Sequence, residues 1–155
     1  MSTNPTESDW QRLWFTTRHK AWSSLAIIPS DPGVEAGSVA ESLVATGRAH
    51  GERPVSLLNG RGIQLSGVHQ LVSTLGAMTG RGEWVIVPVD PIVGNPSTVP
   101  IVQATSAALL VVTLGESYLA SARAAIEAVG RERFLGSVVL GGHADGGPLR
   151  LTLPT

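Results

Sequence analysis

A glycine-rich turn between an apolar segment and a candidate helix is the part of the sequence best suited to chemistry. Residues 24–40 are Ser-Leu-Ala-Ile-Ile-Pro-Ser-Asp-Pro-Gly-Val-Glu-Ala-Gly-Ser-Val-Ala. A strand, a glycine-rich turn and a helix start, in that order, are typical of a phosphate-binding loop, whose backbone N–H groups hold phosphate oxygens. Gly33, Gly37 and Ser38 are the residues that would form such a loop here.

The charged part of a phosphate-binding loop is missing. A working loop needs a lysine directly before its Ser or Thr, where it meets the β- and γ-phosphates. Gly37 occupies that position, and the single lysine of the chain, Lys20, lies upstream of the turn. Glu35 adds a negative charge, and no cation is near it in the sequence. We therefore favour an ordinary helix start, with Ser38 as its cap and the acid suited to the helix dipole, over residual anion binding.

No other residues have the spacing of a metal or hydrolase site. Cysteine is absent, which excludes disulfides and cysteine-based zinc sites. No two histidines lie at a metal-ligand spacing such as i, i+4, and no Gly-x-Ser-x-Gly segment indicates a serine hydrolase. We interpret residues 141–147, with His143 and Asp145, as a flexible turn. The sequence thus predicts no metal site and no catalytic residue. The histidines are His19, His50, His69 and His143.

Length and charge narrow the class of protein. A chain of 155 residues suits one domain, which we expect over residues 9–155 after a flexible tail at 1–8. The 11 basic and 12 acidic residues give a net charge of −1, without the basic excess that nucleic-acid binding requires. The polar N-terminus is unlike a signal peptide, and no apolar run approaches the roughly 20 residues of a membrane span. We therefore predict a cytoplasmic protein with no nucleic-acid partner and no membrane span.

Apolar segments and helical periodicity alternate along the chain. Strands are predicted over residues 25–29, 55–58, 84–89, 108–113 and 135–140, with a last edge strand over 149–153. Helices are predicted over residues 9–20, 38–50, 68–78 and 118–129, with one helical turn at 101–105. The last helix is expected to bury Leu119, Ala122, Ile126 and Val129. This order predicts an α/β fold, a mostly parallel sheet with helices on both faces, in a Rossmann-like three-layer sandwich of the P-loop NTPase type.

Three predicted loops would share one edge of this sheet. In open α/β sheets, ligands bind outside the carboxyl ends of the strands. Residues 29–38, 59–62 and 88–95 follow three of the predicted strands. The candidate site residues in the last two loops are Asn59, Pro88 and Asp90.

Five stretches of the chain, taken in order, carry a family resemblance. They are Ser-Asp-Trp-Gln-Arg-Leu at 8–13, Ile-Pro-Ser-Asp-Pro-Gly-Val-Glu-Ala-Gly-Ser at 28–38, Pro-Val-Ser-Leu-Leu-Asn-Gly at 54–60, Glu-Trp-Val-Ile-Val-Pro-Val-Asp-Pro at 83–91, and residues 107–141. In turn, they resemble the N-terminal oligomerisation helix, the Walker A loop, the second acidic motif, the Walker B strand and the following strand–helix–strand of the bacterial tyrosine kinases (BY-kinases). That family lies within the ParA/MinD-type P-loop ATPases, and its members partner polysaccharide co-polymerases in capsule and exopolysaccharide export.

The departures from the family's motifs bear on activity. Gly37 stands in the place of the catalytic lysine, and Pro88 in that of the Walker B aspartate. Asn59 or Gly60 stands in the place of the aspartate of the second acidic motif. The lone tyrosine, Tyr118, leaves no cluster for autophosphorylation. Because phosphoryl transfer relies on positioned cations that neutralise growing charge, the resemblance with these departures implies a loss of catalysis.

We therefore interpret the chain as a pseudo-ATPase or pseudokinase that regulates or scaffolds bacterial exopolysaccharide (capsular polysaccharide) assembly. The resemblance implies a protein partner, either a membrane polysaccharide co-polymerase or a related active ATPase, and a peripheral place at the inner membrane through that partner. We expect no cofactor. Two alternatives remain open. One is an ATPase that still binds ATP and magnesium through Asp90 and the loop from Gly33 to Ser38. The other is a ParA/MinD-like positioning or adaptor protein.

The first predicted helix carries three large aromatic residues, Trp10, Trp14 and Phe15. Trp and Phe are enriched at protein interfaces, and Trp is enriched among hot spots. The helix also matches the family segment that is associated with self-association. We expect Ser8 or Asp9 to cap it, and we expect one or two of the three rings to be exposed as a partner-binding surface.

Overall fold

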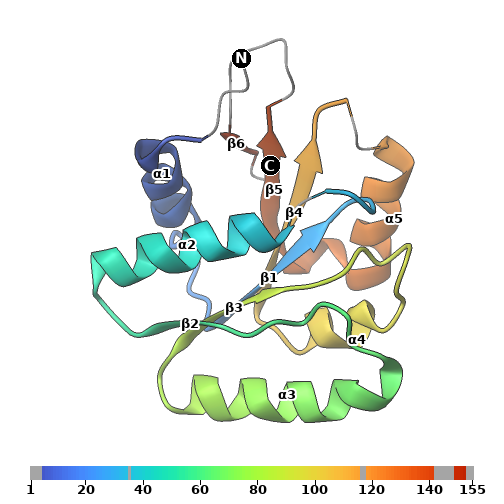
Figure 1. The fold of residues 1–155 in the computed structure, drawn as a ribbon, viewed down its shortest axis with the longest axis horizontal. Helices are drawn as coiled ribbons and strands as arrows, with labels where there is room; N and C mark the ends of the chain where they lie inside the picture. Colours follow the sequence, from blue (N-terminus) through green and yellow to red (C-terminus); the bar gives the residue numbers. More distant parts are fainter. Residues whose placement is uncertain (1–4, 35, 116–117, 142–148, 153–155) are drawn as a thin grey trace.

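The computed structural model describes residues 5–34, 36–115, 118–141 and 149–152, built around a six-stranded sheet of order β2-β3-β1-β4-β5-β6 (Figure 1). The strands are β1 (Ser24–Pro29), β2 (Val55–Leu57), β3 (Trp84–Pro88), β4 (Ala107–Thr113), β5 (Phe134–Leu140) and β6 (Leu149–Thr152). The first five strands pair in parallel, and β6 is antiparallel to β5. The predicted mostly parallel sheet and its last edge strand are confirmed.

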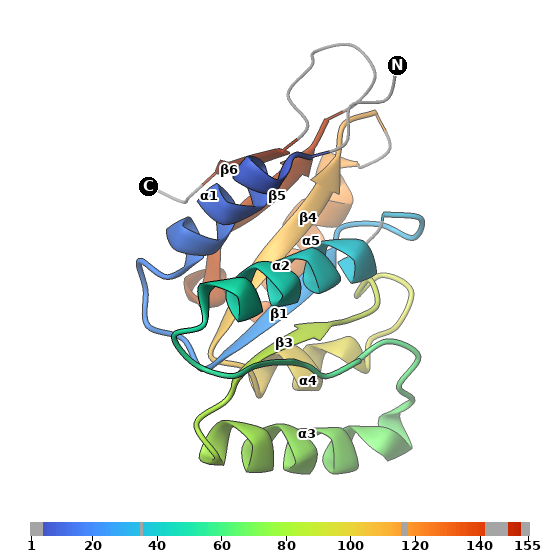
Figure 2. The same cartoon turned by 60° about the vertical axis from the view of Figure 1, so that its left-hand side comes forward.

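Helices cover both faces of the sheet, as Figure 2 shows from a second direction. On one face lie α1 (Glu7–Thr17) and α2 (Ala36–His50). On the other face lie α3 (Leu65–Gly80), α4 (Thr98–Gln103) and α5 (Leu119–Val129). A short 3₁₀ helix, η1 (Arg131–Arg133), leads into β5. The expected three-layer α/β sandwich is therefore confirmed.

The central strand β1 explains why the strands are apolar throughout. Leu25 and Ile27 pack with α1 and α2, whereas Ala26 and Ile28 pack with the helices of the opposite face. All four side chains are fully buried. Successive side chains of a strand point to opposite faces, so a strand covered on both sides has no position for a polar side chain. The sequence of β1 is therefore a continuous apolar run, without the alternation of polar and apolar residues that marks a half-exposed strand.

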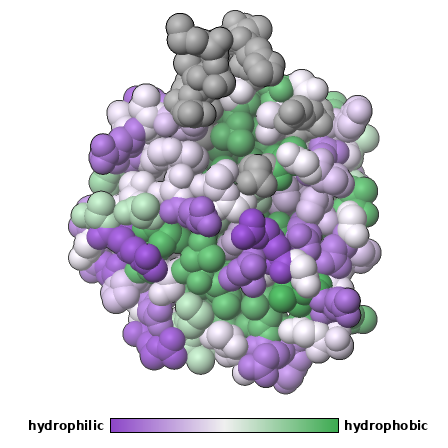
Figure 3. Space-filling view, viewed as in Figure 1, coloured by the Kyte–Doolittle hydropathy of each residue, from purple (hydrophilic) through white to green (hydrophobic). Residues whose placement is uncertain are grey.

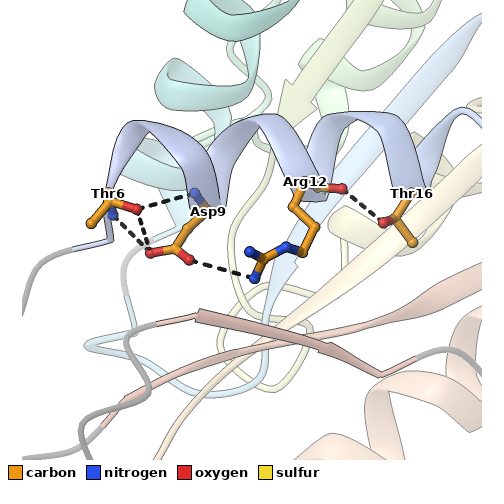
Figure 4. A network of polar contacts seen from close by, with 4 residues as sticks. All are labelled: Thr6, Asp9, Arg12 and Thr16. Carbon is orange, nitrogen blue, oxygen red and sulfur yellow. Dashed lines mark hydrogen bonds and ion pairs between the residues drawn. The ribbon is translucent and has the colours of Figure 1, made fainter.

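Helix α1 begins two residues earlier than predicted, at Glu7 (Figure 4). Thr6 is its cap, in place of the expected Ser8 or Asp9, and the Thr6 Oγ1 accepts a hydrogen bond of 3.2 Å from the Asp9 N–H. The Asp9 carboxylate accepts one of 2.8 Å from the Thr6 N–H in return, which lowers the pKa of Asp9. A reciprocal capping box satisfies two backbone donors that a helix start otherwise leaves unpaired. Glu7 and Ser8 thus belong to the helix and not to the tail.

Two other expectations about the helices are wrong. Because α2 begins at Ala36, Ser38 lies within its first turn and is not its cap. Leu119 was expected to face inward but is 74% exposed. Val129 is buried as expected, Ala122 and Ile126 are partly buried against the core, and α5 also buries Ala125. Leu119 is the first residue of α5, and the buried residues of this helix lie in its second half. Glu35 and most of the turn predicted over residues 141–147 lie outside the described residues.

The surface is a mixture of polar and apolar areas. Figure 3 shows, on the face of Figure 1, green apolar surface between α2 and α3 with purple hydrophilic residues around it. Strand β2 is an edge strand of the sheet and has only three residues. A short edge strand offers few unpaired backbone groups to another chain.

Candidate functional site

The carboxyl ends of β1 and β3 border an open cavity of about 350 Å³. Its walls come from the loop after β1, from Arg61 in the loop after β2, and from the loop after β3. Of the candidate residues, Gly33, Gly37 and Asp90 line it. Because the carboxyl ends of parallel strands meet at one edge, the fold brings together the three loops that the sequence analysis selected.

The loop after β1 is held in place by Asp31, which the sequence analysis did not select. Asp31 is 6% exposed, and its Oδ2 accepts hydrogen bonds from Ser30 Oγ at 3.0 Å and from the Tyr118 N–H at 3.1 Å. Burial raises the pKa of Asp31, but hydrogen bonds from the Ser121 side chain, the Tyr118 N–H and Ser30 outweigh it, so that the pKa is lowered overall. The ionised carboxylate therefore connects this loop to the start of α5.

Gly33 provides the sharp bend in the same loop. Its φ of +93° lies in the region that L side chains rarely adopt, and no atom lies within 4 Å of where its Cβ would be. Glycine is required here for its backbone conformation and not for space.

Arg61 brings a cation to the position where the sequence showed none. A Cβ on Gly37 would lie 2.0 Å from Arg61 Nη1 and 2.9 Å from its Cζ, so the guanidinium occupies the space of a side chain at residue 37. The backbone N–H and the Nε–H of Arg61 each donate to Asn59 Oδ1 at 3.0 Å. Among the described residues, neither Nη atom has a hydrogen bond and no carboxylate lies within 4.0 Å as an ion-pair partner. Within the described part of the chain, two guanidinium nitrogens beside Gly37 therefore have no partner.

Asp90 ties the loops after β2 and β3 together. Its Oδ2 accepts from the Gly62 N–H at 2.7 Å and from Asn95 Nδ2 at 3.1 Å. Its main-chain oxygen accepts from Thr98 Oγ1 at 3.1 Å. Asn95 also donates to the Ile63 carbonyl at 3.0 Å. The structure therefore gives the Asp90 carboxylate a role in holding the cavity wall.

The other candidate residues lie at this edge but do not line the cavity. Pro88 is the last residue of β3 and pairs with Ile27. Its carbonyl accepts from the Gly60 N–H at 2.8 Å, and a Cβ on Gly60 would meet the Val87 and Val89 side chains at 3.0 Å. Asn59 is exposed and orients Arg61. Within the described part of the chain, no group of three or more His, Cys, Asp or Glu side chains is placed to hold a metal ion.

The aromatic residues of α1 divide between the core and the surface. Trp14 is 1% exposed and packs with Trp22 and Trp84, at ring-centroid distances of 5.8 and 5.9 Å. Phe15 is 50% exposed, and Trp10 is partly buried against the core. Trp14 is therefore buried and is not exposed to a partner as predicted, whereas Phe15 and part of Trp10 are accessible.

A second groove runs between α1 and α2, with a volume of about 580 Å³. Trp10, Phe15 and His50 are among the residues that line it. The rings of Phe15 and His50 meet edge to face at 5.1 Å. The exposed aromatic surface of α1 is thus continuous with this groove.

Comparisons with known proteins identify the fold. No family model and no curated protein matches the sequence. The structure is similar to the crystal structure of the chimerical protein CapA2B2, with a TM-score of 0.72 and 12% sequence identity, over 92% of this chain and 87% of that chain. It is also similar to the kinase domain of Escherichia coli tyrosine kinase ETK, with a TM-score of 0.67, 13% identity, and coverage of 92% and 76%. The chain therefore has a BY-kinase-like fold. No helix in the described residues has the length and apolar character to cross a membrane.

Proposed function

We propose that this chain is a non-catalytic member of a bacterial exopolysaccharide assembly system, in which it regulates or scaffolds a protein partner. The observation that carries the proposal is the cavity at the carboxyl edge of the sheet. In the family that the sequence resembles this edge would hold a nucleotide, and by the same resemblance Gly37 stands in the place of the lysine and Pro88 in that of a metal-supporting carboxylate. The nearby acid, Asp90, is engaged in loop contacts.

The chemistry of phosphoryl transfer supports this proposal. Transfer needs cations that bridge the phosphates and an in-line arrangement of attacking and leaving oxygens. Arg61 supplies one cation, but its side chain is exposed and donates a hydrogen bond to only one described acceptor, the neutral Asn59 Oδ1. An arrangement of this kind lacks the rigid support that catalytic groups require.

The proposed role in exopolysaccharide assembly rests on the family resemblance and on the fold shared with a bacterial tyrosine kinase. The partner we propose is a membrane polysaccharide co-polymerase or a related active ATPase, which would hold this chain at the inner membrane. Tagged protein from the native host, purified without detergent and after mild solubilisation, tests this. Recovery of a co-polymerase or an ATPase of that system is expected. Recovery of chromosome- or division-site positioning proteins instead would favour the ParA/MinD-like adaptor.

The second candidate function is a residual nucleotide binder, and Arg61 is the observation that favours it. A guanidinium beside the first turn of α2 can attract a phosphate, and backbone N–H groups at a helix start add donors. Titration calorimetry with ATP, with and without magnesium, distinguishes the two functions. The scaffold proposal expects no saturable heat in either titration. Saturable binding that Arg61→Ala abolishes and Arg12→Ala preserves would establish the nucleotide binder.

The exposed face of α1 is the proposed self-association surface. Phe15 and part of Trp10 are accessible there, and the groove beside them can take an apolar side chain of another copy. Trp14 contributes by fixing the helix to the core.

A further inference from the structure

Two loops bring cations together at the amino edge of the sheet, opposite the cavity. One loop leads from α1 into β1, and the other leads from α2 into β2. Arg48, in the last turn of α2, is fixed to the start of β2, because its Nε donates a hydrogen bond of 2.9 Å to the Val55 carbonyl. The cations of these two segments, called the basic edge below, are Arg18, Lys20, Arg48 and Arg53.

The buried ring of Trp84 holds two of these cations near each other. Trp84 is the first residue of β3, which lies between β1 and β2. Arg18 Cζ lies 3.8 Å from the centroid of this ring, and Arg53 Cζ lies 4.9 Å from it. The Nη1 of Arg18 also donates a hydrogen bond of 2.9 Å to the Trp22 carbonyl. Cation–π contacts with a buried ring position the two guanidinium groups without neutralising their charge.

One acidic residue of the two segments opposes these four cations. It is Glu52, whose Oε2 lies 3.3 Å from His50 Nε2. Burial lowers the pKa of Arg18, while the charge of Glu52 raises it and the charge of Arg53 lowers it. Both charged groups are therefore close enough to act on Arg18. Four cations and one carboxylate leave the basic edge with three positive charges in excess.

This positive charge is accessible to a partner. Of the four cations, Arg18 is half-buried and the others are exposed. Within the described part of the chain, neither Lys20 nor Arg53 has a hydrogen bond or an ion pair. The neighbouring charges before β3, on Arg81 and Glu83, pair with each other at 2.8 Å and add no net charge.

The basic edge has no apolar centre. Six large apolar side chains are exposed among the described residues, and none of them belongs to its two segments. Protein interfaces place apolar and aromatic groups at their centre and charges at the rim. An anionic lipid surface is instead a plane of phosphate groups, which attracts clustered Lys and Arg side chains. Because the whole chain has a net charge of −1, the rest of it is acidic, and the same plane repels it and orients the molecule.

We propose that the basic edge binds the surface of an anionic lipid bilayer. Its guanidinium and ammonium groups contact the lipid phosphates, for which the planar fork of arginine is well suited. This inference goes beyond the proposed function, because it requires no partner protein. The cavity, at the carboxyl edge, then faces away from the membrane, where a protein partner can reach it.

The experiment is flotation of the full-length protein with lipid vesicles that contain no protein. Vesicles of mixed phosphatidylglycerol and phosphatidylcholine are compared with vesicles of phosphatidylcholine alone. We expect binding to the anionic vesicles only, and its loss at about 1 M salt, where the Debye length falls to about 3 Å. Lys20→Ala and Arg53→Ala should each lower the partition coefficient about fivefold, the effect of one cation near an anionic surface. The two effects should be roughly additive in free energy in the double variant, because the exposed cations act independently.

Two further variants separate the loss of charge from damage to the fold. Glu52→Gln removes the opposing carboxylate and should strengthen binding severalfold, a gain that a weakened fold does not explain. Arg123→Ala removes an exposed arginine of α5, away from the basic edge, and should leave binding unchanged. Circular dichroism confirms the fold of each variant.

Several results would overturn the inference. These are equal binding to anionic and neutral vesicles, binding to neither, and equal binding of the wild type and the double variant. Binding to soluble polyglutamate but not to the anionic vesicles, at the same ionic strength, would also overturn it and assign the basic edge to an acidic protein. Failure of the proposed scaffold function is seen separately, as ATP turnover by the protein alone.

Discussion

Two glycines of α2 offer a matched pair of substitutions with opposite expected effects. Gly37 and Gly47 both lie in the helix, and a Cβ on either would approach another side chain closer than 3.0 Å. At Gly37 the neighbour is the far end of the exposed Arg61 side chain. At Gly47 the neighbour is the buried ring of Trp14, whose Cη2 would lie 2.6 Å from the new atom. The two alanine variants therefore differ in what must move.

The expected free energies follow from these neighbours. Alanine gains up to about 1 kcal/mol over glycine in a helix interior, and less in a first turn. At Gly47 this gain is opposed by overpacking, which costs about 1–3 kcal/mol when the neighbour cannot move. Trp14 is held by contacts with Trp22 and Trp84, so we expect Gly47→Ala to be destabilising by about 1–2 kcal/mol in total. Arg61 can rotate into solvent, so Gly37→Ala should be neutral or stabilising by about 0.5 kcal/mol.

Urea denaturation followed by circular dichroism measures both values, and thermal melts should shift by about 2–4 °C per kcal/mol for a chain of this size. Gly37→Ala should also displace the Arg61 side chain while the protein stays folded. Equal stability of Gly47→Ala and wild type would refute the packing argument. A clear loss of stability in Gly37→Ala would show that Arg61 is not free to move.

Three further substitutions test other contacts. Asp31→Asn should lower the free energy of unfolding near pH 7 by about 1–3 kcal/mol. Because the folded-state pKa of Asp31 is lowered, this stabilisation is present above the unfolded pKa of about 3.9 and is lost as the pH falls through the folded value. The urea denaturation curves of the variant and the wild type should therefore converge in acid. A difference that stays constant with pH would contradict this assignment. Trp14→Ala should lower the free energy of unfolding by about 3–5 kcal/mol, because its ring is buried. Phe15→Ala should leave the thermal melt nearly unchanged and lower the mass measured by light scattering. An unaltered mass would mean that α1 does not mediate the proposed self-association. Asp90→Ala should cost about 1–3 kcal/mol in thermal melts, since the Gly62 N–H and Asn95 lose their acceptor, and an unchanged melt would mean that the loops hold without it.

Much of the fold could be predicted because its signals are local. Apolar runs such as that of β1 mark strands covered on both faces, and their alternation with helices leaves few topologies. The helix starts were less predictable. Thr6 and Asp9 cap α1 by a reciprocal pair of bonds, but Ser8 and Asp9 are equally good capping types in the sequence. Which of several capping residues begins a helix depends on backbone conformation outside it.

The candidate site was only partly predictable because its main cation comes from a distant segment. Gly37 and Asp90 were found from the position of their loops after strands. Arg61 is 24 residues from Gly37 in the sequence, and the pairing of β3 between β1 and β2 brings the two loops together. Trp14 was undecided for the same reason, since its burial is due to Trp22 and Trp84 from separate segments.

Steady-state ATP hydrolysis by the isolated protein, with magnesium, tests directly whether the chain has lost catalysis. We predict phosphate release no faster than in buffer alone, and no change on Asp90→Ala or Arg61→Ala. A variant with Pro88→Asp and Gly37→Lys gives a reference for what restored charges alone can do. Turnover by the wild-type protein that falls to background in Asp90→Ala would contradict the account and identify the chain as an active ATPase.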